Sequence, residues 1–452
     1  MTKKKLFVKS FGCQMNVYDS TRMIDTLVGV GYEESQSEHS ADLIILNTCH
    51  IREKASEKIF SELGKLRVYK EERHKEGRQT RIAVAGCVAQ AEGGQIIKRE
   101  KSVDLVIGPQ NYHRLPELLT RLESESALVD TEFPAEEKFD FLPYPTEEKT
   151  RSRGISAFVT IQEGCDKFCA FCVVPYTRGA ENSRPVEKVI EEIKNLAQSG
   201  VCEVTLLGQN VNAYSGPNRV GQSVSLAGLI QLISEIPGIK RIRYMTSHPN
   251  DMQADLIAAH ANQKALMPFL HLPVQSGSDH ILAAMNRKHT AQDYLDLIKK
   301  IRTSNPDIAL SSDFIVGFPG ENEADFEATL ELIRQVRFSS SYYFKYSPRI
   351  GTPSADLTDQ ISETVMQSRF TRLQDLVEAQ RREFNHSMKG KILEVLVEKK
   401  GKYEGQIMGK SPYMQPVHVR ASDELIGQLI KVEITDISTN SLFGNIVDQA
   451  AL

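Results

Sequence analysis

Short apolar runs alternate with longer stretches of helical spacing over residues 3–120. The apolar runs lie at residues 6–8, 43–46, 82–85 and 103–107. Among the stretches between them, residues 52–70 predict a charged helix. Short strands separated by helices favour a parallel sheet with crossover connections. This region is therefore predicted to form a parallel α/β domain.

The pattern stops over residues 121–150, where the composition changes. From Glu123 to Thr150, nine acidic residues face two lysines, and the segment contains Pro134, Pro143 and Pro145. Proline interrupts regular elements, and like charges repel one another. We expect an acidic interdomain linker without regular structure.

The alternation resumes, with longer helices, over residues 151–383. Strands are predicted at 157–161, 203–207, 241–245, 268–272, 310–316 and 342–346. Amphipathic helices lie between them, for example over 186–197 and 291–302. Six strand–helix units are too few for a closed eight-stranded barrel, so a partial (β/α)6 barrel is predicted.

A charged helix is predicted over residues 368–385, and beyond it the pattern is of strands alone. These strands are expected at 392–398, 403–408, 416–419, 429–434 and 442–447. Five short strands joined by turns indicate a small β-barrel of the OB type over residues 385–448.

The composition narrows the class of protein. The 452 residues are 40% hydrophobic and 25% charged, with a net charge of -4. Such values are typical of a globular protein, and any contact with nucleic acid would need a local basic patch. No apolar run has the length of a signal peptide or a membrane span. We expect a cytoplasmic protein without membrane contact, whose seven cysteines are thiols or metal ligands.

Cys165, Cys169 and Cys172 form a Cys-x3-Cys-x2-Cys loop. Three neighbouring thiolates can converge on one metal centre, whereas a [4Fe-4S] cluster normally takes four cysteines. The loop would leave one iron open, and an open position supports chemistry. The alternative is a zinc knuckle or three core cysteines, although the spacing differs from that of zinc modules.

Cys13, Cys49 and Cys87 each stand shortly after a predicted strand. In a parallel sheet the loops after the strands meet at one carboxyl edge, where such folds bind ligands. The three thiols therefore predict a second three-cysteine site. The alternative is buried structural cysteine, because free cysteine is among the most buried residue types. Cys202, at the entry to a core strand, is assigned to packing.

Several segments carry a resemblance to a known family. The Cys165 loop resembles the cluster loop of radical S-adenosylmethionine (SAM) enzymes, in which SAM chelates the open iron. The resembling segments are Gly-Cys-Gln-Met-Asn-Val-Tyr-Asp over 12–19, Glu-Gly-Cys-Asp-Lys-Phe-Cys-Ala-Phe-Cys-Val-Val-Pro-Tyr-Thr-Arg-Gly over 163–179, Leu-His-Leu-Pro-Val-Gln-Ser-Gly-Ser over 270–278 and Asn-Arg-Lys-His-Thr over 286–290. Together they resemble the methylthiotransferases, which join a three-cysteine domain, a radical SAM core and a TRAM domain. The resemblance covers essentially the whole chain.

The resemblance implies two [4Fe-4S] clusters, one on each cysteine triplet, with SAM as a further cofactor. The Cys165 cluster would cleave SAM to a 5′-deoxyadenosyl radical, the Cys13 cluster would handle sulfur, and a second SAM would supply the methyl group. The implied reaction is methylthiolation of carbon 2 of N6-isopentenyladenosine at tRNA position 37. The implied partners are tRNA and a one-electron reductant such as flavodoxin or ferredoxin, and a monomer is expected.

Motifs after later barrel strands supply further candidate SAM contacts. Gln209 and Asn210 stand where the superfamily has a Gly-Gly-Glu-like element, with Gln209 replacing the acid. The other candidates are Gln275, Ser276, Asp313, Gly317 and Glu321, with Phe314 or Ile315 packing on adenine. Each motif has a tight strand-to-helix turn as its alternative. The segment ending at Arg178 would shield a cluster, contact phosphate or form a structural turn.

Residues 385–420 hold seven Lys or Arg and three Glu, a local charge of +4. The residues expected to contact RNA are Lys399, Lys400, Lys402, Lys410 and Arg420, with Tyr403 and Tyr413 between them. Cations and aromatic rings on a small barrel suit contact with the RNA backbone and stacking of bases. A solvated surface of mixed charge is the alternative.

Other functions stay open at this stage. Within the same chemistry, the substrate would be threonylcarbamoyl-adenosine in tRNA or an aspartate of a ribosomal protein. From a different class, the chain would be an RNA-binding Fe-S redox sensor without turnover.

Overall fold

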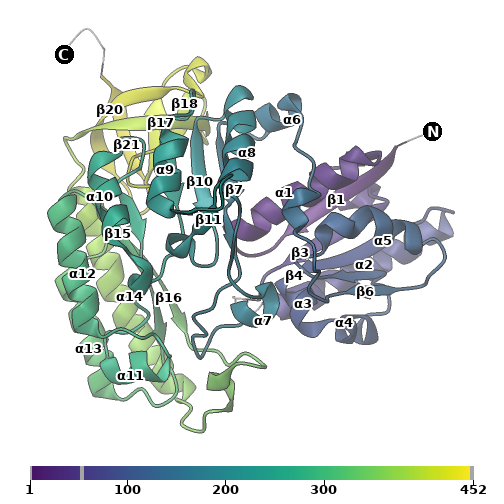
Figure 1. Cartoon of the computed structure of the whole chain (residues 1–452), viewed down its shortest axis with the longest axis horizontal. Coiled ribbons are helices and arrows are strands. Elements are labelled where there is room, and N and C mark those ends of the chain that lie inside the picture. Colours follow the sequence, from purple (N-terminus) through teal and green to yellow (C-terminus); the bar gives the residue numbers. More distant parts are fainter. Residues whose placement is uncertain (1–2, 51–54, 448–452) are drawn as a thin grey trace. The chain divides into compact units, whose positions relative to one another are not determined.

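The computed structural model describes residues 3–50 and 55–447, which form two compact units (Figure 1). Unit 1 contains the chain up to Thr146 together with Glu163–Asp166 and Val173–Asn182. Unit 2 contains Glu147–Gln162, Lys167–Cys172 and the chain from Ser183. Residues 52–54 of the predicted charged helix and residue 448 of the predicted C-terminal barrel lie outside the described residues.

Unit 1 is built on a six-stranded sheet whose neighbouring strands are all parallel. In order across the sheet, the strands are β2 (Tyr32–Glu34), β1 (Lys4–Ser10), β3 (Leu43–Thr48), β4 (Arg81–Gly86), β5 (Leu105–Ile107) and β6 (Leu128–Asp130). The helices of this unit are α1 (Gln14–Gly29), α2 (Ala55–Lys75), α3 (Cys87–Glu92), α4 (Gly94–Arg99), α5 (Leu115–Arg121) and α7 (Val174–Arg178). The predicted parallel α/β fold is confirmed.

The side chains of β3 show why this sheet has helices on both faces. Leu43 and Ile45 pack in a core with residues of α1, whereas Ile44 and Leu46 pack in a second core with residues of α2. Successive side chains of a strand point to opposite faces, so a run of four apolar residues needs cover on both.

The expectation that residues 121–150 lack regular structure is wrong in part. Leu128 begins β6, which pairs in parallel with β5 and places the Leu128 side chain in the core beside α5. A helix, α6 (Glu147–Ser152), follows the prolines. A strand of three residues is too short to show alternation, and an edge strand tolerates the acidic residues around it.

Unit 2 begins with six parallel strands, arranged as two sheets of three. Their orders are β13 (Arg241–Tyr244), β10 (Glu203–Leu207) and β7 (Ser156–Thr160), and then β14 (Phe269–His271), β15 (Ala309–Val316) and β16 (Ser340–Lys345). The sheets meet where the Ile242 amide donates to the Ala265 carbonyl (2.7 Å) and the Ile242 carbonyl accepts from Met267 (3.0 Å). The predicted partial barrel is confirmed.

Helices of unit 2 connect the strands of this partial barrel or follow them in the chain. They are α8 (Val186–Gln198), α9 (Leu226–Ser234), α10 (Ala254–Asn262), α11 (Asp279–Ala284), α12 (Ala291–Ser304), α13 (Glu323–Val336) and α14 (Glu363–His386). The remaining short strands are β8 (Gln162–Glu163), β9 (Asn182–Ser183) and the hairpin of β11 (Ser215–Pro217) with β12 (Ser223–Ser225). None of the helices described in either unit has the length and apolar character needed to cross a membrane.

A closed five-stranded barrel ends unit 2. Its strands, in order around the barrel, are β17 (Ile392–Lys400), β18 (Gln406–Lys410), β19 (Pro416–Arg420), β21 (Leu442–Ile446) and β20 (Leu429–Ile437). Along β17, Leu393, Val395 and Val397 alternate into its core. The prediction of a small OB-like barrel is confirmed.

Candidate functional site

The cysteines of unit 1 lie where the parallel sheet ends. Cys13 directly precedes α1, Cys49 follows β3, and Cys87 is the first residue of α3, immediately after β4. Because β1, β3 and β4 are neighbours in the sheet, their carboxyl ends carry all three thiols to one edge. This placement is the one that the strand pattern predicts.

Gly12 brings two of these cysteines together. It has a φ of +119°, and a Cβ at this position would lie 2.1 Å from the Cβ of Cys49 and 2.9 Å from its Sγ. A hydrogen bond from Cys49, which outweighs the effect of burial, lowers the pKa of the Cys13 thiol to about 6. Burial raises the pKa of Cys87. Of Cys13 and Cys87, Cys13 is therefore the thiol more ready to act as thiolate.

Polar side chains hold the backbone under these thiols. Asn47 donates to the Asn16 carbonyl and to the Ser20 hydroxyl, both at 2.9 Å, while Asn16 accepts from the Cys13 thiol at 3.3 Å. Asn16 and Asn47 are both fully buried. Hydrogen-bonded buried amides of this kind keep the loop after β1 fixed against β3.

Arg178, at the end of α7, brings a buried positive charge to this edge. Its side chain is 2% exposed, and it donates to Asp19 at 2.6 Å and to Glu163 at 2.9 Å. Its charge also acts to lower the pKa of the Cys87 thiol, against the larger effect of burial, which raises it. Burial acts to lower the pKa of Arg178, but the charges of Asp19, Cys87 and Glu163 hold it well above its usual range. The Arg178 guanidinium is enclosed by its own partners, whereas the three roles considered for the segment ending at this residue stay predictions.

The second cysteine loop is divided between the units. Cys165 belongs to unit 1, where its amide donates to the Gly179 carbonyl at 3.3 Å. Gly164 before it has a φ of +73°, and a Cβ there would lie 1.9 Å from the Ala180 carbonyl oxygen. Only glycine therefore fits at this position.

Cys169 and Cys172 belong to unit 2, where Cys172 donates its amide to the Cys169 carbonyl at 2.9 Å. Arg287, which is 4% exposed, points its Nη1 at the Cys169 sulfur at 3.6 Å. Asn286 has a φ of 60° and donates to the Phe168 carbonyl at 2.8 Å. The Asn-Arg-Lys-His segment thus supports the cysteine loop, a role that its sequence did not suggest.

The cysteine triplets fit an Fe-S cluster by the chemistry of their donors. Sulfur donors select Fe-S clusters and other soft metals, and each triplet has a buried arginine beside it to offset the thiolate charge. Within residues 3–50 and 55–447, no three Cys, His, Asp or Glu side chains stand ready-arranged around a metal position. The assignment of the six cysteines as ligands therefore stays a prediction.

The predicted SAM contacts at β10 lie beside the cysteine loop of unit 2. The amides of Gln209 and Asn210 donate to Gln162 Oε1 at 2.9 and 3.0 Å. Asn210 Nδ2 donates to Asp251 at 2.8 Å, and Lys167 of the loop is paired with the same carboxylate at 2.7 Å. The β10 motif is thereby tied to the loop between Cys165 and Cys169.

Among the later candidates, Gln275 and Asp313 lie together. Gln275, with a φ of 76°, donates its amide to the Asp313 carbonyl at 3.0 Å, and the Asp313 carboxylate lies 3.4 Å from His271. Ser276 instead faces α13, with its hydroxyl 3.2 Å from that of Thr329. Ser276 therefore forms part of a strand-to-helix turn, which was the alternative considered for it.

Gly317 and Glu321 form a second turn of this kind. Glu321 accepts from the Gly317 amide at 2.7 Å and from Arg369 at 3.1 Å. Burial raises the pKa of Glu321 to about 7. The Phe314 ring is fully buried in the barrel core, so of the two residues predicted to pack on adenine, Ile315 is the one that stays a candidate.

The predicted RNA-binding residues of the C-terminal barrel divide into two groups. Lys399, Lys402 and Arg420 are exposed, and Lys400 is exposed although paired with Asp423 at 2.5 Å. Lys410 is bound to Glu398 at 2.8 Å and is only partly exposed. Tyr403 beside the first group is 66% exposed, as a stacking residue would have to be.

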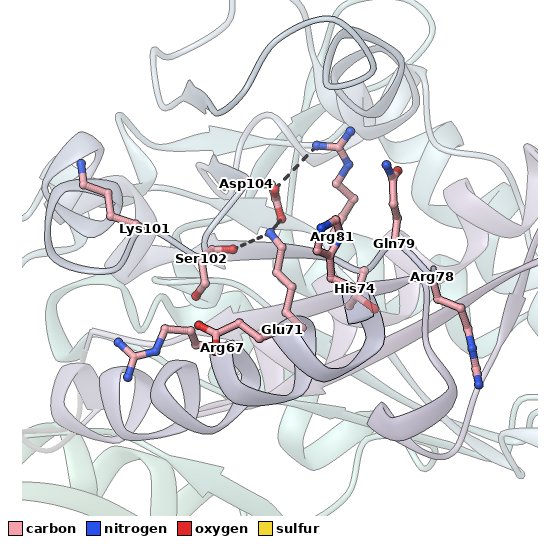
Figure 2. A pocket seen from close by; sticks show the side chains of 11 residues that line it. Arg67, Glu71, His74, Arg78, Gln79, Arg81, Lys101, Ser102 and Asp104 are labelled. Atoms are coloured by element: carbon pink, nitrogen blue, oxygen red, sulfur yellow. Dashed lines mark hydrogen bonds and ion pairs between the residues drawn. The ribbon is translucent and has the colours of Figure 1, made fainter. Parts of the chain in front are cut away.

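Unit 1 also has a surface pocket lined largely by charged and polar side chains (Figure 2). It encloses about 450 Å³ and is lined by Arg67, Lys70, Glu71, His74, Arg78, Gln79, Thr80, Arg81, Lys101, Ser102 and Asp104. Asp104 at its centre accepts from Lys70 at 2.6 Å and lies 3.6 Å from Arg81. Because Arg81 begins β4 and Asp104 precedes β5, the pocket is at the amino edge of the sheet, opposite the thiols.

Known families match three successive parts of the chain. Residues 5–108 match the uncharacterized protein family UPF0004, residues 159–333 match the radical SAM superfamily, and residues 386–447 match the TRAM domain. This order of domains is the signature of one group of radical SAM enzymes. The chain belongs to the methylthiotransferases.

Solved structures share the fold of the methylthiotransferase chain at low sequence identity. The cobalamin-dependent SAM radical enzyme OxsB, with aqua-cobalamin and SAM bound, has a TM-score of 0.53 and 14% identity, covering 83% of this chain and 56% of its own. The radical SAM methyltransferase TsrM from Kitasatospora setae, with cobalamin and a [4Fe-4S] cluster bound, has a TM-score of 0.55 and 13% identity, covering 78% and 77%. The chain thus spans little more than half the length of OxsB.

Proposed function

We propose that this methylthiotransferase modifies tRNA, converting N6-isopentenyladenosine at position 37 to its 2-methylthio derivative. The observation that carries the proposal is the convergence of Cys13, Cys49 and Cys87 at one sheet edge, in a chain that also has a radical SAM loop and a TRAM domain. Within the family, the segments around Cys13 and Cys165 most resemble MiaB.

The cofactors of the proposal are two [4Fe-4S] clusters and SAM. Cys165, Cys169 and Cys172 would hold one cluster and Cys13, Cys49 and Cys87 the other. When bound, these groups supply the radical and sulfur chemistry that amino acid side chains lack. The acceptor carbon of adenine has a C–H bond that ordinary acid–base residues do not activate.

The residues of the chain would bind the clusters and SAM, orient them and shield them. Arg287 presents an N–H donor to the sulfur of Cys169, and the charge of Arg178 acts on the Cys87 thiol. Gly12 and Gly164 allow the loops to approach their neighbours without a side chain. Gln209, Asn210, Gln275 and Asp313, grouped around the barrel strands β10, β14 and β15, are the proposed SAM contacts.

The exposed cations of the TRAM barrel are proposed to hold the RNA backbone. Lys399, Lys402 and Arg420 offer point charges to phosphates, and Tyr403 offers a ring face to a base. A one-electron reductant would supply electrons, and the chain is proposed to act in the cytoplasm as a monomer.

Anaerobic reconstitution tests the proposal. The protein is loaded with iron and sulfide, mixed with SAM and dithionite, and given tRNA that carries isopentenyladenosine. Nucleoside mass spectrometry should show the 2-methylthio product together with 5′-deoxyadenosine. If the enzyme modifies threonylcarbamoyl-adenosine or an aspartate of a ribosomal protein instead, that group replaces isopentenyladenosine as the proposed substrate. If no 5′-deoxyadenosine forms, a redox sensor without turnover is favoured.

A further inference from the structure

Strand β16 carries two exposed aromatic rings on one of its faces. Tyr342 is 55% exposed and Phe344 is 43% exposed, and the two stand two positions apart in the strand. Successive side chains of a strand alternate between its faces, so both rings lie on the same face. Aromatic side chains gain most from burial, and an exposed pair on one face is therefore a candidate contact surface.

The opposite face of β16 is the one that packs against a helix. Tyr343, between the two rings, donates its hydroxyl to Glu378 of α14 at 3.2 Å, and its ring centre lies 5.2 Å from that of Phe370. The neighbouring strand β15 agrees, because its Phe314 packs in one core with residues of α12 and α13. The exposed rings therefore lie on the face turned away from the helices, which in a partial barrel is the interior face.

The register of the sheet sets what lies beside the rings. Tyr342 is paired with Asp313, and Phe344 is paired with Ile315, in the parallel ladder of β16 with β15. The His271 ring of β14 lies 5.8 Å from the Tyr342 ring and at 80° to it. The aromatic surface thus continues across the sheet into a polar part formed by His271 and Asp313.

This polar part has an unused hydrogen-bond acceptor. Asp313 Oδ1 is buried and accepts no hydrogen bond from the residues that the structure describes. The Nε2 atom of His271 lies 3.4 Å from it. A buried acceptor without a donor is costly, and such groups in proteins usually have a partner. A bound molecule with N–H or O–H groups is therefore expected beside the rings.

The same face borders the second cysteine loop. Ile315 packs against a small apolar cluster that contains Ala170, which lies between two cysteines of that loop, and Tyr346. The Tyr346 hydroxyl donates to Ser354 at 2.9 Å, and the Ser354 amide donates to the Ala170 carbonyl at 3.0 Å. All of these residues belong to unit 2. The loop therefore lies next to the residue that is paired with Phe344.

We propose that Tyr342 and Phe344 bind the target base of the RNA by stacking. The ligand class is a planar nucleobase, and the rings would hold it on the interior face of the partial barrel, next to the cysteine loop. Enzymes that act on a base take it out of its stack and hold it against aromatic or apolar side chains. The inference deepens the proposed function and rests on its RNA substrate.

Two observations favour a base of RNA over the adenine of SAM. Among the strands that the structure describes, β16 is the last of its sheet, so its outer side is open to a large ligand. The proposed SAM contacts, by comparison, are grouped around β10, β14 and β15, and none of them lies on β16. Stacking on an aromatic ring also suits any base, because every base has a π-face.

The test compares two RNA hairpins on the full chain, reconstituted anaerobically with iron and sulfide. Both hairpins have the same anticodon loop, with N6-isopentenyladenosine at position 37 in one and an abasic site there in the other. They offer the same phosphates, so the ratio of their dissociation constants measures the contact with the base. By fluorescence anisotropy, the wild-type chain should bind the first hairpin about tenfold more tightly, which is the order expected for one stacked base.

Removing both rings should abolish this preference. The double variant Tyr342→Leu with Phe344→Leu keeps apolar side chains, and it should bind both hairpins as the wild-type chain binds the abasic one. Tyr342→Phe retains the ring and should keep most of the preference.

Tyr343→Leu is the matched control, because Tyr343 stands on the same strand but faces α14. It should lower the unfolding temperature and leave the ratio of the two dissociation constants unchanged.

Three results would overturn the inference. The double variant keeps the wild-type preference, or the wild-type chain has no preference, or the double variant weakens the binding of SAM in equilibrium dialysis and leaves the preference intact. The last result would assign the rings to the adenine of SAM. Should the double variant not fold, Tyr342→Leu and Phe344→Leu are measured singly, and each should reduce the preference.

The proposed function fails in a different way. If the preference for the base depends on the rings but no 2-methylthio product forms, the binding site stands and the proposed reaction is wrong.

Discussion

Arg178 in unit 1 and Arg243 in unit 2 are equally buried cations, with side chains 2% and 3% exposed, but their partners differ. Arg178 lies at the carboxyl edge of a parallel sheet, where it binds two carboxylates and its charge acts to lower the pKa of the Cys87 thiol. Arg243 lies within β13, where it binds Glu203 and the carbonyls of Ser411 and Pro412.

The difference lies in what each cation can influence. Apart from Glu203, the partners of Arg243 are carbonyl groups, which have no charge to gain or lose, and through them Arg243 joins the TRAM barrel to the partial barrel. Arg241 does the same through the carbonyls of Glu394 and Lys410, at 2.6 and 2.9 Å. Thiols change their charge and bind metal, so the charge of Arg178 bears on chemistry. A buried arginine thus takes its role from the groups that it contacts.

The largest expected effect is on stability at the TRAM junction. Arg243→Met leaves Glu203, which is 2% exposed, without its nearest cation. It also leaves the carbonyls of Ser411 and Pro412 without the Arg243 donors. Breaking one partner of a buried pair costs about 3–5 kcal/mol. Denaturant unfolding of the full chain measures the loss.

The exposed pair Arg337–Glu383, at 2.8 Å, is the control for this change. Arg337→Met should cost about 0–1 kcal/mol, as exposed ion pairs do. Equal losses of unfolding free energy for Arg243→Met and Arg337→Met would contradict a structural role for the buried contacts of Arg243.

The pH dependence of the stability should report on a third buried arginine, Arg369, through its partner Glu321. Glu321 beside it keeps its proton up to about pH 7 in the folded chain, against an ordinary value of 4.5. The folded state therefore binds more protons between these values, so this stabilisation is complete below pH 4.5 and is lost as the pH rises through 7. The loss is about 3 kcal/mol, from 1.36 kcal/mol per pH unit.

Glu321→Gln removes the titrating group and should flatten this part of the pH profile, as measured by urea unfolding at pH 5 and 7.5. The same pH slope in the wild-type and Gln chains would assign the dependence to another group.

A smaller effect is expected on RNA affinity. Lys399→Ala and Lys402→Ala each remove one exposed cation and should each reduce the salt slope of binding to single-stranded RNA by about 0.7. Lys410→Ala should leave the slope unchanged, because this lysine is committed to Glu398. Fluorescence anisotropy over a range of salt concentrations measures all three, and equal slopes throughout would place RNA on another surface.

The strand pattern predicted most of the fold because apolar runs and helical spacing are local properties. The prediction of a strand at 203–207 coincides with β10, and the five C-terminal strands form the predicted barrel. The short strand β6 was missed because three residues among acidic neighbours leave no periodic signal. The same limit explains why the linker was expected to lack regular structure.

For the site, the sequence by itself determined which thiols stand at strand ends and which segments resemble the methylthiotransferases. Only the tertiary structure decided what surrounds those thiols. Arg178 and Asp19 are 159 positions apart, and Arg287 and Cys169 are 118 apart. No spacing rule reaches over such distances, because these contacts depend on how strands order themselves in a sheet and how helices pack on it. The fold brings Arg287 to the Cys169 sulfur and Arg178 to Asp19, on the helix that begins after Cys13.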